Sequence, residues 1–68
     1  MATVSTHAER LERAISNKTM RQADIAQLYQ AALAARAVVD WHAVNAAIIE
    51  RWSMSGLSRI KAMAWKGL

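Results

Sequence analysis

The chain of 68 residues contains no cysteine, no proline and no phenylalanine, and it has only two glycines. Without cysteine, disulfides and thiolate metal sites are excluded as stabilising elements. Without proline, nothing interrupts helical patterns, and the chain has no Asn-Gly or Asp-Gly hairpin signal. A chain of this size buries only roughly 60% of the surface that its unfolded form exposes. We therefore expect a regular helical fold, oligomerisation, or both.

Long apolar runs are also missing. No stretch approaches the ~18 consecutive apolar residues of a membrane span. The opening MATVSTHAER has no basic start, no apolar core and no small-residue cleavage site, so we do not expect a signal peptide. The expected location is the cytoplasm.

Acidic residues are absent from the C-terminal part of the chain. The net charge is +4 and the pI is near 10.4. The first fifty residues hold five cations and five acids, whereas residues 51–68 hold four cations and no acid, namely Arg51, Arg59, Lys61 and Lys66. This excess suits an anionic partner but does not indicate a fold.

Capping signals and apolar stripes predict an all-α fold. We expect one helical domain over residues 6–68, preceded by a flexible N-terminus over residues 1–5. It should be a compact array of about four short helices, at approximately 7–16, 20–37, 41–52 and 55–66. Each is too short to be stable alone in water, so each must dock through its apolar stripe.

Three helix starts carry recognisable caps. Thr6 with Glu9, and Thr19 with Gln22, have the spacing of a capping box. Asp40 is a favourable N-cap for the third helix.

The second helix supplies two candidate interaction residues, Tyr29 and Arg36. Tyr29 belongs to an apolar stripe with Ile25 and Ala32, and Arg36 falls inside the same sector. The Arg36 stem either lies along apolar surface with its head in water, or it meets an acidic group on a partner protein.

The third helix carries Trp41, Val44, Ile48 and Trp52 on one face. Asn45 also lies within this face. A buried Asn must find a hydrogen-bond partner, either a nearby backbone group or a residue across a helix–helix contact.

The fourth helix begins after Ser53 or Ser55, and Gly67 is placed for its C-cap. Its buried stripe is expected to contain Leu57, Ile60, Met63 and Ala64. Arg59 and Lys66 fall on the opposite face, and Lys61 and Trp65 lie together at one rim. This pair either covers the edge of the core or forms an interaction surface, because a cation beside an aromatic suits both a protein interface and phosphate contact with base stacking.

Catalytic and metal-binding patterns are missing. His7 and His42 have no ligand partner at helical spacing, and the chain has no glycine-rich phosphate loop or nucleophile motif. We expect no enzyme, cofactor, metal or small-molecule substrate.

A nucleic-acid-binding interpretation depends on AIIERWSMSGLSRIK, which has the form of a helix, a short turn and a basic helix. Ile60 is one residue from the expected packing position, and no Asn or Gln stands where a base would be read. The candidate contacts are Arg51, Ser58, Arg59, Lys61 and Lys66. QADIAQLYQ is a weaker candidate for the first helix of such a motif.

Two segments resemble known families. The pattern DW…N.AII.RWS..GL.RIK..AWK in residues 40–66 resembles small phage and prophage reading frames of unassigned function. LERAI and DIAQLYQAA, within residues 11–32, are similar to Hha-like modulators that join the nucleoid protein H-NS, although the downstream half departs from them. The first resemblance implies an accessory factor that binds a host protein in the bacterial cytoplasm.

The leading hypothesis is a non-enzymatic, phage-derived interaction protein that contacts itself or a host protein through helix faces. The alternative is a small DNA- or RNA-binding module that uses the last helix. A membrane-surface helix is a third and weaker hypothesis, because the polar face of that helix is small.

Overall fold

The computed structural model describes residues 6–66, and it contains three helices: α1 (His7–Ser16), α2 (Gln22–Ala34) and α3 (Trp41–Lys66). No strand occurs within this described range, so the prediction of an all-α fold is confirmed. α1 has the predicted bounds. The expected flexible N-terminus and the expected cap at Gly67 lie outside the described residues.

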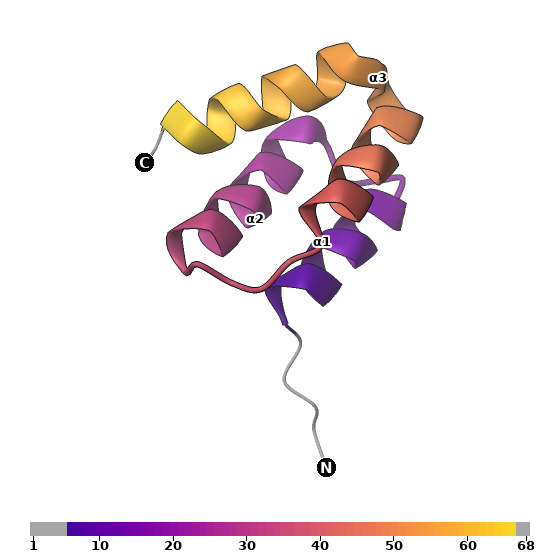
Figure 1. Cartoon of the computed structure of the whole chain (residues 1–68). Helices are drawn as coiled ribbons and strands as arrows, with labels where there is room; N and C mark the ends of the chain where they lie inside the picture. The colour runs from indigo at the N-terminus through magenta and orange to yellow at the C-terminus, as the bar shows by residue number, and fades with distance from the viewer. Residues whose placement is uncertain (1–5, 67–68) are drawn as a thin grey trace.

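α3 covers the two helices that were expected at approximately 41–52 and 55–66, and these two helical stretches meet at a kink. One residue inside it, Ser53, has non-helical backbone torsions, with φ 68° and ψ −178°. This break falls where the boundary between the third and fourth helices was expected, but helical structure resumes directly after Ser53, so the two stretches form one kinked element and the structure has three helices where about four were expected. The chain turns sharply within α3, so that its C-terminal half runs across α2 (Figure 1).

Local side-chain caps start α1 and α3 as predicted. The Thr6 Oγ1 accepts a hydrogen bond from the backbone N–H of Glu9 at 3.2 Å. The Asp40 Oδ1 accepts one from the N–H of Ala43, also at 3.2 Å. Each cap satisfies one of the amides that a helix leaves without an internal partner.

The predicted cap of α2 at Thr19 is wrong. The Thr19 hydroxyl donates to Asn17 Oδ1 at 2.7 Å, and the Thr19 N–H donates to the same atom at 3.0 Å. The N-cap is Arg21 instead, whose backbone N–H donates to Asp24 Oδ2 at 3.2 Å. Asn17 thus holds Thr19 in the turn, and α2 begins at Gln22 rather than at residue 20.

α2 also ends earlier than predicted, through a left-handed cap at Arg36. Arg36 has a φ of 53°, and its N–H donates to the Leu33 carbonyl at 3.1 Å. The Ala37 N–H donates to the Ala32 carbonyl at 3.0 Å. This pair of bonds is the Schellman motif, in which glycine usually occupies the left-handed position. Arg36 therefore lies beyond the helix and is exposed, not within its apolar sector.

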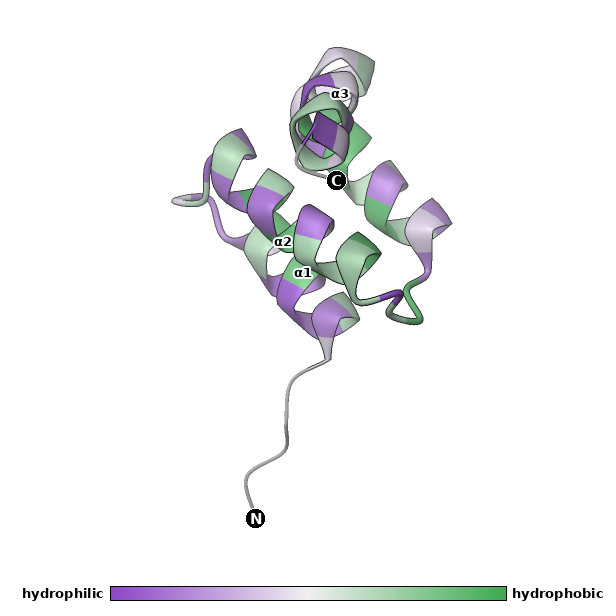
Figure 2. Cartoon of the chain, turned by 90° about the vertical axis from the view of Figure 1, so that its left-hand side faces the viewer, coloured by the Kyte–Doolittle hydropathy of each residue, from purple (hydrophilic) through white to green (hydrophobic). Residues whose placement is uncertain are grey.

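The core lies where the three helices meet. Its largest fully buried side chains are Leu11, Ile25, Ile48 and Ile60. Hydrophobic and hydrophilic residues both occur along each helix (Figure 2). In the last turns of α3, Leu57, Ile60 and Ala64 are buried as predicted, but Met63 is 40% exposed. The buried stripe is thus narrower than the sequence indicated.

Candidate interaction surface

Arg51 joins α3 to the end of α1. Its guanidinium donates to the carbonyls of Ile15 at 2.9 Å and Met20 at 2.7 Å, and more weakly to that of Ala14 at 3.4 Å. A helix leaves its last carbonyls without internal partners and carries partial negative charge there. The half-buried Arg51 guanidinium supplies hydrogen-bond donors to these carbonyls and places a positive charge at the negative end of the helix.

This arrangement corrects the prediction that Arg51 contacts nucleic acid. Its guanidinium carbon also lies 4.1 Å from the centroid of the Trp52 ring, in cation–π geometry. The charged group is therefore engaged within the fold and is not presented to a phosphate. A signal was present in the sequence, since Arg51 follows Val44 and Ile48 on the buried face at helical spacing.

Tyr29 belongs to the core and not to an interaction surface. Its side chain is 3% exposed, and its ring centroid lies 4.6 Å from that of Trp41. The Tyr29 hydroxyl donates to Asn45 Oδ1 at 3.0 Å, so the predicted partner of Asn45 is a side chain of another helix. Burial raises the pKa of Tyr29 above its ordinary value, because it disfavours the charged phenolate. The prediction of Tyr29 as a partner contact is thus wrong.

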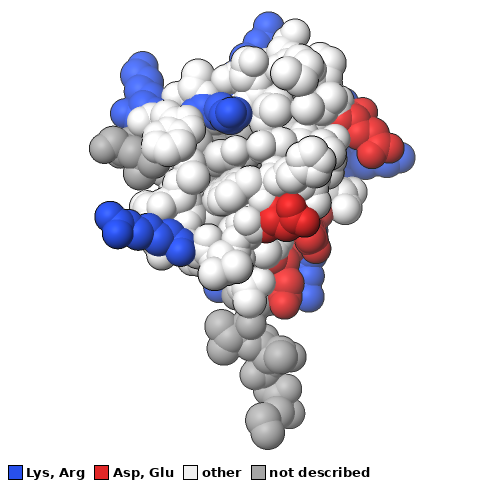
Figure 3. Space-filling view, viewed as in Figure 1, with Lys and Arg blue, Asp and Glu red and all other residues white. Residues whose placement is uncertain are grey.

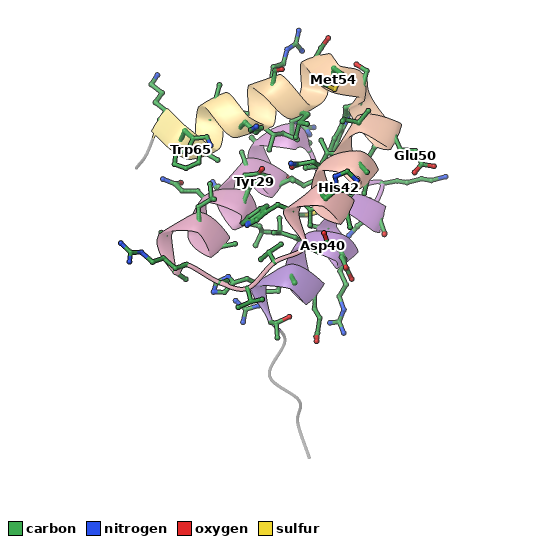
Figure 4. All side chains as sticks on the ribbon, viewed as in Figure 1. Tyr29, Asp40, His42, Glu50, Met54 and Trp65 are labelled. Carbon is green, nitrogen blue, oxygen red and sulfur yellow. The ribbon has the colours of Figure 1, made fainter. Side chains whose placement is uncertain are left out.

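The exposed rim of α3 is formed by Met54, Ser58, Lys61 and Trp65. These residues follow one another at intervals of three or four, so they share one side of the helix. All four are exposed, with Met54 at 62% and Trp65 at 56%. Met54 lies at the bend and Trp65 at the opposite end of this half of α3 (Figure 4). The predicted pairing of Lys61 with Trp65 on one rim is therefore consistent with the structure.

Cations accompany this α3 rim. Arg59 and Lys66 are exposed on the side of the same helix that adjoins the rim, as predicted. On the face shown in Figure 3, the acidic side chains gather on the right, where cationic side chains accompany them, whereas the left edge and the top carry cationic side chains without acidic ones. The C-terminal half of α3 thus presents an aromatic side chain among positive charges.

Within residues 6–66, no group of three or more His, Asp or Glu side chains is placed to hold a metal ion. In the same range, no helix is both long and apolar enough to cross a membrane. His42 is exposed and His7 is half-buried.

Comparisons with known proteins give no relative for this chain. No protein-family model, curated protein or solved structure matches it.

Proposed function

We propose that this chain is a non-enzymatic interaction protein that binds another protein through the α3 rim. The resemblance of residues 40–66 to phage and prophage reading frames supports a host protein as that partner, which the chain would modulate in the bacterial cytoplasm. Association of the chain with itself is part of the same proposal.

Trp65 is the observation that carries this proposal. A Trp side chain can bury about 150–250 Å² on contact, and here more than half of it faces solvent. The core does not need it, since Leu57, Ile60 and Ala64 already supply the buried stripe of this half-helix. Trp, Met and Arg are the residue types that protein interfaces favour, and all three occur on or beside the rim.

The charge around Trp65 indicates the kind of protein surface that fits. Lys61 lies one turn from Trp65, and Arg59 and Lys66 flank the pair without an acid in residues 51–66. A complementary surface would offer an apolar pocket for the indole with acidic side chains at its margin. Such complementarity would act mainly on the association rate and on the choice of partner.

The experiment is capture of host proteins from a bacterial lysate on the immobilised chain, followed by titration of each captured protein in purified form. Trp65→Ser should weaken binding by about 30-fold or more, since a central Trp typically contributes about 2 kcal/mol or more. Lys61→Glu should slow association, with a smaller effect at high salt.

Val38→Ser is the matched control. Val38 is 98% exposed, so it is equally dispensable for the core, but it lies in the connection between α2 and α3. This variant should bind as the unmodified chain does. A captured protein that binds the Trp65→Ser variant with unchanged affinity would contradict the proposal.

A DNA- or RNA-binding module is the second candidate. The observation in its favour is that Ser58, Arg59, Lys61 and Lys66 are all exposed on one half-helix. Phosphate contact by a few cations predicts weak binding that falls steeply with salt. Reversing the charge of Arg59 and Lys66 should abolish any gel shift with duplex or single-stranded probes at low salt. Absence of a shift with the unmodified chain eliminates this candidate.

A further inference from the structure

The bend in α3 depends on a strained residue. Ser53 has φ 68° and ψ −178°, a region of backbone space that only glycine adopts readily. The residues on both sides of Ser53 are helical. One residue therefore separates the bent α3 from a continuous helix, and straightening would relieve its strain.

A second residue, Gly56, is also required by the bend. A Cβ atom built on Gly56 would overlap the Cβ of Trp52. In a continuous helix, side chains at i and i+4 have Cβ atoms about 5–6 Å apart, so the same two positions would not collide. The space at Gly56 is thus needed by the bent form and not by a straight one.

From these two residues we infer that α3 exchanges between two copies of the chain. In the straight form, the C-terminal half of α3 leaves its own α2 and docks on the α2 of a second copy, which returns the same segment. The buried residues Leu57, Ile60 and Ala64 then make the same contacts between chains as they make within one chain. The exchange is reciprocal, so it closes as a symmetric dimer without open ends.

Three substitutions act on this equilibrium in known directions. Ser53→Gly relieves the strain in the bent form and disfavours the straight helix, so it stabilises the monomer. Each dimer contains two copies of residue 53, so the relief of strain counts twice when the dimer dissociates into bent monomers. The dimer dissociation constant should therefore rise by about a hundredfold. Ser53→Ala favours the helical torsions, and Gly56→Ala blocks the bend, so both should shift the chain to the dimer.

The test is to refold the four chains from denaturant at increasing concentration and to measure their mass by light scattering. The unmodified chain should form more dimer as the concentration rises, Ser53→Gly should stay monomeric, and the two alanine variants should be dimeric at the lowest concentration. A dimer formed by exchange of the C-terminal half of α3 keeps the packing of the helices. The alanine variants should therefore show the same helical circular dichroism as the unmodified chain. Alanine variants that are monomeric, whether folded or unfolded, overturn the inference, as does an unmodified chain that is monomeric throughout.

A distance measurement distinguishes exchange from association of bent chains. The chain has no cysteine, so spin labels can be placed at two engineered cysteines, at the exposed Ala43 and Ala62. Nineteen residues of straight helix separate them by about 28 Å. Labelled dimer diluted with unlabelled chain should show this distance, and the Ser53→Gly monomer should show a shorter one. A dimer with the monomer's distance overturns the exchange.

This inference develops the self-association within the proposed function, but its test uses no host protein and leaves Trp65 unchanged. Failure of the exchange would leave binding of a partner at the α3 rim intact. Loss of binding on Trp65→Ser would likewise leave the mass and the spin-label distance unchanged.

Discussion

Replacing Arg51 by Met should destabilise the fold strongly. Met keeps much of the side-chain stem but removes the donors to the carbonyls of Ile15 and Met20. A hydrogen bond from a charged donor contributes about 1.5–3 kcal/mol, and water can partly replace the donor at this half-buried site. The expected loss is about 2–4 kcal/mol, with the contact to the Trp52 ring adding a smaller part.

This loss is large for so small a domain. Stabilities of about 0.05–0.15 kcal/mol per residue give roughly 3–10 kcal/mol for the whole chain. At about 4–8 °C per kcal/mol, the melting temperature should fall by about 8–32 °C. Urea and thermal unfolding followed by far-ultraviolet circular dichroism measure both quantities.

Arg59→Met is the matched control for this prediction. Arg59 lies on the same helix but is exposed, so its replacement should change stability by less than about 0.5 kcal/mol. If Arg51→Met is as stable as Arg59→Met, the role assigned to Arg51 is refuted.

Three further predictions concern individual positions. Arg36→Gly should stabilise the fold by about 0.5–1 kcal/mol in urea titrations, because glycine adopts the left-handed φ without strain, whereas Arg36→Ala should give no gain. Because the pKa of Tyr29 is raised in the folded state, the contribution of Tyr29 to the free energy of unfolding is complete below its unfolded-state pKa of about 10 and is lost as the pH rises through its folded-state pKa. Melting curves at increasing pH should show this loss of stability for the unmodified chain, and Tyr29→Phe should remove it. Thr6→Ala should cost about 1 kcal/mol in thermal unfolding and Thr19→Ala less, because only Thr6 caps a helix.

The features that could be predicted from the sequence are those that neighbouring residues determine. Thr6 and Asp40 cap helices because each needs only an amide three residues away. The α3 rim could be placed because Lys61 and Trp65 lie on one continuous stretch of helix, where spacing alone defines the face. The absence of proline made an all-α fold the natural expectation.

Contacts between distant segments could not be predicted in this way. Arg51 lies thirty-one residues from Met20 in the sequence, and Tyr29 lies sixteen from Asn45, so no local pattern pairs them. The end of α2 was missed for another reason. The left-handed position after a helix is usually marked by glycine, and here Arg36 occupies it.

The internal position of Arg51 also changes how the nucleic-acid hypothesis must be tested. Within the described residues, the C-terminal half of α3 exposes three cations, Arg59, Lys61 and Lys66. Three phosphate contacts give a logarithmic salt slope of about −2.7, a loss of about 40-fold in affinity between about 50 and 200 mM salt, whereas four contacts would give about 150-fold. A partner protein held through Trp65 would depend far less on salt, because burial of an indole involves no counterion release. The salt slope of any bound partner, compared between the unmodified chain and Trp65→Ser, therefore separates the two functions at the same surface.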